Sequence, residues 1–272
     1  MTGLDLQALM APVTELAVGA GERILEVYRG SFAVDLKADN SPLTAADRAA
    51  HRHIVDGLGR LAADIPLLSE EGDIAPFSER RHWTRYWLID PLDGTREFVK
   101  RNGEFTVNIA LIENHQPVLG VVHAPVAGVT WFAARGCGAR KRSAEDERPI
   151  AARPLGGPMT AVVSRSHRGE RVDALLERLP VVQTVSVGSS LKFCLLAEGK
   201  ADLYPRFGPT SEWDTAAAHC VLEAAGGKVT KLDLTPLRYN TKDSLLNPDF
   251  LAFGDPSHDW SHYLEDLHGE DR

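Results

Sequence analysis

An apolar strand that runs directly into a cluster of acidic residues constrains this chain most. Residues 86–89, Tyr-Trp-Leu-Ile, have the composition of a buried strand, and they lead straight into residues 90–95, Asp-Pro-Leu-Asp-Gly-Thr. Pro91 lacks the N–H that a strand ladder needs, so we expect the ladder to stop there. Gly94 permits a turn that a residue with a Cβ would resist. The sequence therefore predicts a rigid loop at the end of a buried strand.

The two carboxylates of this loop, Asp90 and Asp93, indicate a metal site. A structural turn would need the proline and the glycine but not the acids, because burying unpaired carboxylates is costly. Two carboxylates, the Thr95 hydroxyl and free backbone carbonyls form an oxygen-only ligand set. Hard divalent cations such as Mg²⁺ prefer such ligands.

Three further segments place acids at the end of a strand or the start of a helix, where side chains can converge without disturbing a core. They contain Asp47, Glu70-Glu71 and Asp214. Each has a simpler interpretation when taken alone. Asp47 could be an exposed helix charge, residues 70–71 a solvated acidic turn, and Asp214 a helix cap, which is a frequent role for aspartate.

The order of hydrophobic patterns predicts layered sheets and helices, an α/β fold with α+β layering. The first half combines amphipathic helices, short strands and an antiparallel meander, and a charged linker over 135–158 follows it. We expect one unit over 1–272, with a metal-binding half, 1–150, an α/β half, 151–272, and a cleft between them. The predicted helices cover 4–29, 43–61, 168–178, 190–198 and 214–225, and the strands 32–36, 65–69, 86–89, 105–112, 118–123, 129–134, 161–164, 181–187 and 201–204.

Composition restricts the partners. The formal net charge of −8 argues against a nucleic-acid polymer, although a metal and local cations allow a small anionic substrate. The scattered cysteines fit a reducing compartment, with Cys194 and Cys220 in the core. With no signal peptide or membrane-spanning segment recognisable, we expect a cytoplasmic protein. The sequence leaves peripheral attachment to the inner membrane and the oligomeric state open.

A competing phosphatase motif has different spacing. Haloacid-dehalogenase-type enzymes carry Asp-x-Asp-Gly-Thr, in which a period of two places both acids on one side of an extended chain. Here Asp90 and Asp93 are three positions apart with a proline between them, and the loop follows two helices. A covalent aspartyl-phosphate mechanism is therefore not the favoured interpretation.

In these motifs the chain resembles the Mg²⁺-dependent, lithium-sensitive inositol monophosphatase superfamily. The resemblance rests on residues 69–71, Ser-Glu-Glu, on the 90–95 loop, and on residues 213–217, Trp-Asp-Thr-Ala-Ala. It extends from residue 39 to about residue 248 and implies alternating helix and sheet layers, αβαβα. Within the superfamily the chain is most similar to the CysQ-type 3′(2′),5′-bisphosphate nucleotidases, through residues 100–108, 164–167, 188–194 and 203–209.

The resemblance implies a role for each matching residue. Two or three Mg²⁺ ions would be held by Glu70, Asp90, Asp93, Asp214 and the Leu92 carbonyl. The attacking water would be activated by Asp47 and Thr95 together with Glu70. The implied substrate contacts are those metal-site residues other than Asp90, with Gly94, Thr95, His167, Ser189, Lys192 and Arg206, and Arg165 is a further cation near this group.

The implied reaction removes the 3′-phosphate from adenosine 3′,5′-bisphosphate to give AMP, by direct attack of water. The sulfated relative, 3′-phosphoadenosine 5′-phosphosulfate, is a second candidate substrate, and the resemblance implies a place in sulfur metabolism. Two alternatives remain open. One is an inositol monophosphatase or sugar-phosphate phosphatase using the same site, and the other is a catalytically silent, metal-dependent nucleotide-binding protein.

Overall fold

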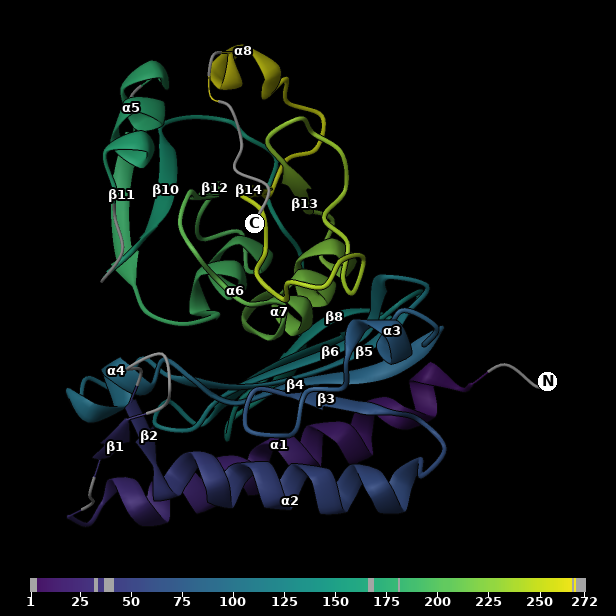
Figure 1. Ribbon diagram of the computed structural model, residues 1–272. Helices are drawn as coiled ribbons and strands as arrows, with labels where there is room; N and C mark the ends of the chain where they lie inside the picture. Colours follow the sequence, from purple (N-terminus) through teal and green to yellow (C-terminus); the bar gives the residue numbers. More distant parts are fainter. Residues whose placement is uncertain are drawn as a thin grey trace.

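The computed structural model has alternating layers of helices and sheets (Figure 1). It describes residues 4–31, 34–36, 42–165, 169–180, 182–265 and 267. A pair of long helices covers one face of a seven-stranded sheet, and two shorter helices separate that sheet from a five-stranded one. Two more helices, α5 and α8, lie beyond the smaller sheet. The predicted α/β layering is confirmed.

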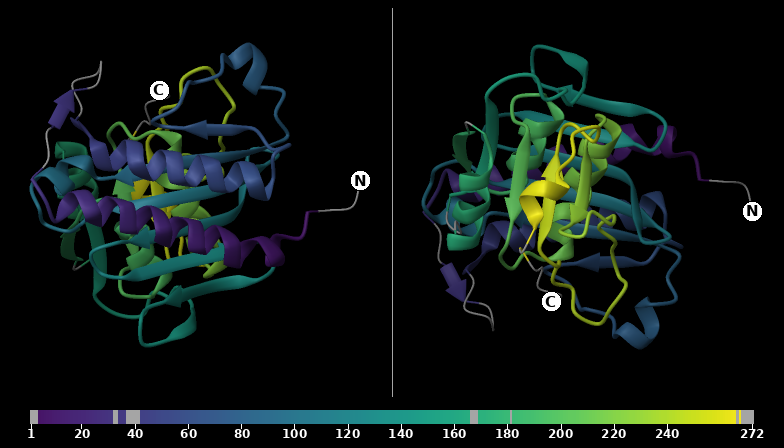
Figure 2. Two further views of the ribbon diagram at one scale, coloured as in Figure 1. Left: turned by 90° about the horizontal axis from the view of Figure 1, so that it is seen from below. Right: turned by 90° about the horizontal axis from the view of Figure 1, so that it is seen from above.

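The first layer is the antiparallel helix pair α1 (Leu6–Tyr28) and α2 (Ala45–Leu61), which lie side by side across the larger sheet (Figure 2). Both were expected from their apolar periodicity, and their apolar faces are buried. Gly57 allows close packing of the two helices, because a Cβ there would lie 2.1 Å from a Leu16 methyl carbon. In the chain between these two helices, strand β1 (Val34–Leu36) pairs with β2 (Pro42–Thr44).

The larger sheet holds its strands in sequence order, β3 to β9, with β3 parallel to β4 and the others antiparallel. Short helices α3 and α4 flank β4 in the chain. The predicted meander is confirmed as β5, β6 and β7. The bounds are β3 Leu67–Ser69, α3 Phe77–Arg80, β4 Arg85–Asp93, α4 Thr95–Val99, β5 Thr106–Glu113, β6 Gln116–Ala124, β7 Val129–Ala134, β8 Gly138–Arg142 and β9 Glu147–Ile150.

The expectation that Pro91 ends the strand ladder was wrong in one respect. Strand β4 continues through Pro91 to Asp93, with a bulge in its pairing to β5. Asp90 pairs with Asn108 and Asp93 with Thr106, so β4 carries one more residue than its partner over this interval. The proline and the bulge interrupt the ladder locally and re-aim the side chains, as bulges near functional sites commonly do.

The predicted linker over 135–158 was also wrong in its first part, because β8 and β9 extend the larger sheet there. Arg140 and Arg142 on β8 both form ion pairs with Glu147 on β9. Charged residues typically protect the exposed edge of a sheet, and such an edge hairpin has the composition of a loop. Composition alone therefore concealed these strands.

The smaller sheet has the order β11-β10-β12-β14-β13, with β10 parallel to both of its neighbours. The strand and helix alternation predicted for this half is confirmed up to α7, whereas β13, β14 and α8 were not predicted. The bounds are β10 Met159–Ser164, α5 Glu170–Arg178, β11 Val182–Val187, α6 Leu191–Ala197, β12 Leu203–Arg206, α7 Glu212–Ala224, β13 Lys228–Lys231, β14 Phe250–Phe253 and α8 Ser261–Leu264.

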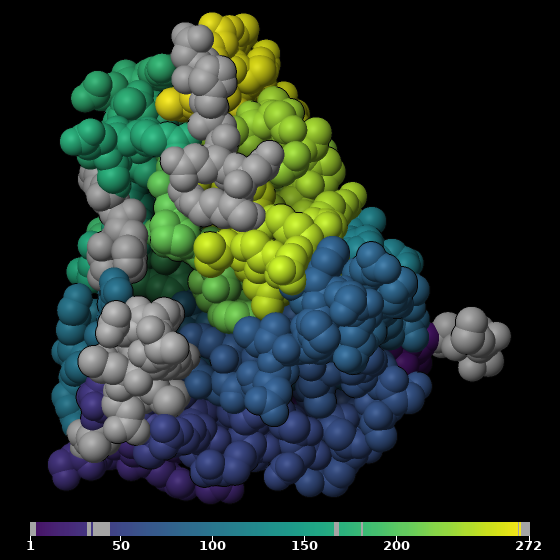
Figure 3. Space-filling model, viewed as in Figure 1, coloured from purple at the N-terminus to yellow at the C-terminus, as the bar shows by residue number. Residues whose placement is uncertain are grey.

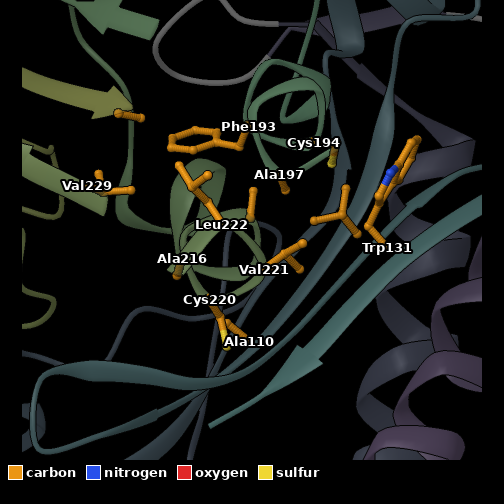
Figure 4. Packing of buried hydrophobic residues seen from close by; sticks show 14 of the residues in the cluster. Ala110, Trp131, Phe193, Cys194, Ala197, Ala216, Cys220, Val221, Leu222 and Val229 are labelled. Atoms are coloured by element: carbon orange, nitrogen blue, oxygen red, sulfur yellow. The ribbon is translucent and has the colours of Figure 1, made fainter. Parts of the chain in front are cut away.

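Helices α6 and α7 pack between the two sheets through an apolar core (Figure 4). Cys194 and Cys220 lie in this core, where burial raises the pKa of both thiols. Strand β6 packs tightly against α7 at Gly120, since a Cβ there would lie 2.2 Å from the Ala217 carbonyl oxygen. In space-filling view the second half of the chain rests on the first (Figure 3). The core therefore fixes where α7 begins relative to β4.

Candidate active site

Three of the predicted metal ligands converge where β4 meets the start of α7. One carboxylate oxygen each from Asp90, Asp93 and Asp214 lies within 4.8 Å of the others, and these three form the candidate metal cluster found in the described part of the chain. Asp90 and Asp93 lie at the two ends of the β4 bulge. Asp214 comes from the first turn of α7.

The three carboxylates destabilise one another when all are ionised. Burial raises the pKa of Asp90 well above its ordinary value, and the negative charges of Glu70, Asp93 and Asp214 raise it further. Burial and the charges of Asp93 and Glu70 likewise raise the pKa of Asp214. Burial raises the pKa of Asp93 as well, although Lys192 and Ser190 counteract it. Such a buried excess of negative charge fits a divalent cation, which would compensate it.

Backbone and side-chain donors fix the orientation of each acid. Asp90 accepts a hydrogen bond from the Leu92 N–H at 3.0 Å, and Asp214 accepts one from the Ser211 N–H at 2.9 Å. Asp93 Oδ2 accepts from both the N–H and the hydroxyl of Ser190, at 2.7 and 2.8 Å. Because these bonds hold the carboxylates in place, the cluster is pre-organised for a metal.

Glu70 and Leu92 lie beside this cluster. Glu70 follows β3 directly, its N–H donates to the Ile89 carbonyl at 3.1 Å, and its side chain is hydrogen-bonded to Asp90. The Leu92 carbonyl accepts from the Thr95 hydroxyl at 3.3 Å. The parallel pairing of β3 with β4 therefore brings the acidic turn of the sequence to the same sheet edge as the loop.

Asp47 is buried, and it is held by the capping box of α2. Its Oδ2 accepts from both the N–H and the hydroxyl of Thr44, at 2.7 and 2.6 Å. Its Oδ1 accepts from the Thr95 hydroxyl at 3.4 Å. One carboxylate thus closes the helix with one oxygen and contacts the loop at residues 90–95 with the other. The alternative that Asp47 is an exposed helix charge was wrong, because its side chain is buried in these contacts.

Gly94 makes the turn after the bulge. Its φ is +93°, in the region that favours glycine, and a Cβ there would lie 3.1 Å from the Glu104 carbonyl oxygen. Thr95 then begins α4. Gly94 and Thr95 both line a cavity of about 300 Å³ that also contains the three clustered aspartates.

The same cavity also carries positive charge. Lys192 and Arg206 are both buried and both line the cavity, as does Ser189. Burial lowers the pKa of Lys192 to about 8, with Asp93 opposing this effect and Arg206 adding to it. Arg206 Nε and the Ser189 hydroxyl are buried without a hydrogen-bond partner. Unpaired buried polar atoms in residues that line a cavity are suited to an anionic ligand.

The structure brings together the predicted site residues that it describes, whereas His167 lies outside the described residues. Arg165 also lines the cavity, but its guanidinium group is paired with Glu104. Sequence reasoning missed Ser190 and Asn108 as supports of Asp93. Both lie inside segments that carry the family resemblance, so their position in those segments was the available signal.

A model of the inositol monophosphatase family matches residues 5–260, and the chain belongs to this family, whose members are metal-dependent. The chain is 54% identical over 251 residues to the 3′(2′),5′-bisphosphate nucleotidase CysQ of Shigella flexneri, an alignment that covers 89% of this chain and 98% of that protein. The crystal structure of CysQ from Bacteroides thetaiotaomicron is similar, with a TM-score of 0.82 and 43% identity over 94% of this chain and 100% of that one.

An inositol monophosphatase from Anabaena also shares the fold, with a TM-score of 0.77 and 26% identity over 97% of this chain and 96% of that one. The family expected from the motifs is therefore confirmed. No helix in the described part of the chain combines the length and the apolar character needed to cross a membrane.

Proposed function

We propose that this protein is a 3′(2′),5′-bisphosphate nucleotidase that hydrolyses the 3′-phosphate of adenosine 3′,5′-bisphosphate to give AMP. The observation that carries the proposal is the presence of both signs of charge in one cavity. Asp90, Asp93 and Asp214 line this cavity together with the buried cations Lys192 and Arg206. A substrate with two phosphates can use both, one phosphate at a metal held by the acids and the other at the cations, and the similarity to the bacterial nucleotidases supports this choice.

The acidic residues that line the cavity fit Mg²⁺. The number of ions, two or three, is part of the proposal. Asp90, Asp93, Asp214, Glu70 and the Leu92 carbonyl would hold the ions. Bound there, the ions would supply positive charge to the reacting phosphate and lower the pKa of the attacking water. We further propose that the halves 1–150 and 151–272 act as one catalytic unit, since ligands come from both.

Asp47 and Thr95 would direct the attacking water. The Thr95 hydroxyl oxygen lies 3.4 Å from Asp47 Oδ1 and 3.3 Å from the Leu92 carbonyl oxygen. In the reaction the hydroxyl would donate its proton to Asp47 Oδ1, and its oxygen would accept a hydrogen bond from water. The proton released during attack would move through this hydroxyl to Asp47 Oδ1. Because Thr44 holds the other oxygen of Asp47, the base has a fixed orientation.

The polar groups of Lys192, Arg206 and Ser189 would bind the second phosphate. Lys192 supplies charge, and Arg206 Nε and the Ser189 hydroxyl supply unpaired donors. These groups would place the 3′-phosphate against the acidic cluster, because the two phosphates are attached to one ribose. The backbone N–H groups of Gly94 and Thr95 would contact the reacting phosphate.

Phosphate release from four substrates tests the proposal. We would measure adenosine 3′,5′-bisphosphate, 3′-phosphoadenosine 5′-phosphosulfate, inositol 1-phosphate and fructose 1,6-bisphosphate with Mg²⁺, and again with added Ca²⁺ or Li⁺. The expected result is a preference for the adenosine bisphosphate with inhibition by Li⁺. Faster turnover of inositol 1-phosphate would assign the protein to the second candidate function, and nucleotide binding without phosphate release would indicate a silent binding protein.

A further inference from the structure

Glu104 joins three segments although it lies outside the acidic cluster. Its Oε2 accepts from the Gly188 N–H and from Arg165 Nε, both at 2.8 Å, and its Oε1 accepts from an Arg165 terminal nitrogen at 2.6 Å. The same arginine nitrogen donates to the Ser186 carbonyl at 2.9 Å. Glu104 precedes β5 in the larger sheet, whereas its partners follow β10 and β11 in the smaller one. The contact therefore connects the two sheets beside the cavity.

The main chain at Glu104 is also closely packed against two glycines. A Cβ on Gly188 would lie 2.8 Å from the Glu104 carbonyl oxygen, and a Cβ on Gly94 would lie 3.1 Å from the same atom. Glu104 is thus held between the turn of the metal loop and the start of α6. Its carboxylate bonds and its backbone packing act on the same neighbour, Gly188.

The segment that Glu104 holds, residues 188–192, contacts the acidic cluster and also contributes Ser189 and Lys192 to the cavity wall. Ser190 donates to Asp93, and Lys192 Nζ donates to the Ser189 carbonyl at 2.5 Å. Ser189 adopts a φ of +47°, an uncommon conformation for a serine, and its buried hydroxyl has no partner. Such a conformation requires support from its surroundings. The bond from the Gly188 N–H to Glu104 supplies support one residue away.

We propose that Glu104 and Arg165 form a positioning pair that fixes residues 188–192, and so sets the preference of the site for a substrate carrying a second phosphate. Arg165 lines the cavity, but its charge is matched by Glu104 through two parallel hydrogen bonds. Bidentate pairs of this kind are the geometrically specific ones, unlike most exposed ion pairs. The pair acts through Ser189 and Lys192 and does not touch the substrate. This inference rests on the proposed function.

A different arrangement would give a different result. If Arg165 left Glu104 on binding and contacted the second phosphate itself, removing Glu104 would release the arginine and tighten binding. Removing Arg165 would then weaken binding far more than removing Glu104. A positioning pair instead predicts a loss from Arg165→Ala no larger than that from Glu104→Ala, because Glu104 alone bonds the Gly188 N–H and Arg165 orients that carboxylate.

The test compares Glu104→Ala, Arg165→Ala and the double variant with the wild type, using adenosine 3′,5′-bisphosphate and adenosine 3′-monophosphate. Glu104→Ala should raise KM for the bisphosphate by about tenfold, the loss expected when one charge-assisted contact no longer orders the site, and Arg165→Ala should raise it by no more. The double variant should be no worse than Glu104→Ala. KM for the monophosphate and both kcat values should change less than about twofold.

Conservative variants and a distant ion pair serve as controls. Glu104→Gln retains an acceptor for the Gly188 N–H and should recover part of the KM loss. Glu147→Ala breaks a similarly exposed Arg–Glu contact on the β8–β9 edge and should leave both substrates unaffected. Hydrogen exchange at the Gly188 amide should be faster in Glu104→Ala and unchanged in Glu147→Ala.

Several results would overturn the proposal: additive losses in the double variant, an equal loss for both substrates, a lower KM in Glu104→Ala, or unchanged exchange at Gly188. The proposed function is tested separately by the wild type. If the wild type hydrolyses neither nucleotide, the proposed function fails, and the exchange measurement still decides whether the pair fixes the segment.

Discussion

At the scale of single residues, the acids of the site have opposing effects on folding and function. Asp90 is buried among other carboxylates, which raises its pKa and makes its ionised form unfavourable in the folded protein. An acid whose pKa is raised by folding contributes stability below its unfolded pKa, and that stability is lost as the pH rises through the folded pKa. The arrangement suits a metal and disfavours the metal-free fold.

Asp90→Asn should therefore abolish turnover and stabilise the metal-free protein. We expect kcat to fall by roughly a thousandfold, since a ligand that orders metal charge at the phosphate is lost. The asparagine oxygen can still accept from the Leu92 N–H. In chelator, Tm should exceed that of the wild type, by a margin that widens as the pH rises. Retained activity at saturating Mg²⁺, or a lower Tm, would contradict the assignment.

Lys192 predicts how substrate binding depends on pH. Its pKa of about 8 means that the ammonium group is charged below that pH and neutral above it. KM for adenosine 3′,5′-bisphosphate should rise above pH 8, by up to about tenfold per pH unit, because the cation that faces the second phosphate is lost. KM for adenosine 3′-monophosphate should show a weaker dependence.

Lys192→Arg provides the control for this pH dependence, because an arginine stays charged throughout the range. The variant should bind less tightly at pH 7, since the cavity is shaped for lysine, but its KM should not rise between pH 8 and 9.5. A rise equal to that of the wild type would assign the titration to another group.

At the scale of secondary structure elements, the starts of α2 and α7 carry two of the carboxylates that we propose act in the site. Asp47 and Asp214 both occupy the third position of a helix and both accept from the backbone N–H of the residue before it, Thr44 or Ser211. The negative charge at these positions also interacts favourably with the helix dipole. The capping role weighed for Asp214 is therefore present together with its place in the acidic cluster.

Thr44→Ala should affect both the capping contact of Asp47 and its proposed role in catalysis. Loss of the hydroxyl should cost about 1 kcal/mol in the free energy of unfolding, a typical value for a helix cap. It should also lower kcat by about tenfold, because Asp47 loses one of the donors that orient it. Chemical denaturation and steady-state kinetics would measure the two effects. Thr44→Ser keeps the hydroxyl and should restore both.

The sequence predicted elements well where the pattern was periodic and poorly where the edge of a sheet was charged. The long helices and the meander have clear apolar periods. Strands β8 and β9 were missed because most of their side chains are partly or fully exposed and their charged residues form ion pairs. Strand β14 was missed although it is paired on both sides, to β12 and β13, because it is short and follows a long irregular segment.

The acidic residues proposed as metal ligands could be picked out because each lies in a motif that is local in the sequence. The contacts that support them could not, since they join residues far apart. Ser190 and Asp93 are 97 positions apart, and Glu104 and Arg165 are 61 apart. Only the packing of the two sheets around α6 and α7 brings such pairs together.

At the scale of the whole molecule, the position of α7 depends on its tight packing against the larger sheet. Gly120→Ala would place a Cβ against the Ala217 carbonyl, a backbone atom that cannot move alone. We expect the free energy of unfolding to fall by about 1–3 kcal/mol, the usual effect of overpacking. Because Asp214 begins the same helix, kcat should fall as well.

Gly59→Ala is the matched control, because its added Cβ would meet open space on α2. It should be neutral or stabilise the protein by up to about 1 kcal/mol, as expected for glycine replaced by alanine within a helix. Thermal unfolding and kinetics of both variants would be compared. An unaltered kcat in a folded Gly120→Ala protein would show that the site does not depend on this contact.

The convergence of Asp90, Asp93 and Asp214 also has a consequence for synthesis of the chain. Ribosomes make Asp90 and Asp93 before the third acid, Asp214, which lies more than a hundred positions later on α7. A nascent chain can complete the larger sheet and its covering helices while still lacking the acid that α7 contributes. Hydrolytic activity should therefore begin only after α7 has been translated, so that products terminated before α7 would not consume the substrate.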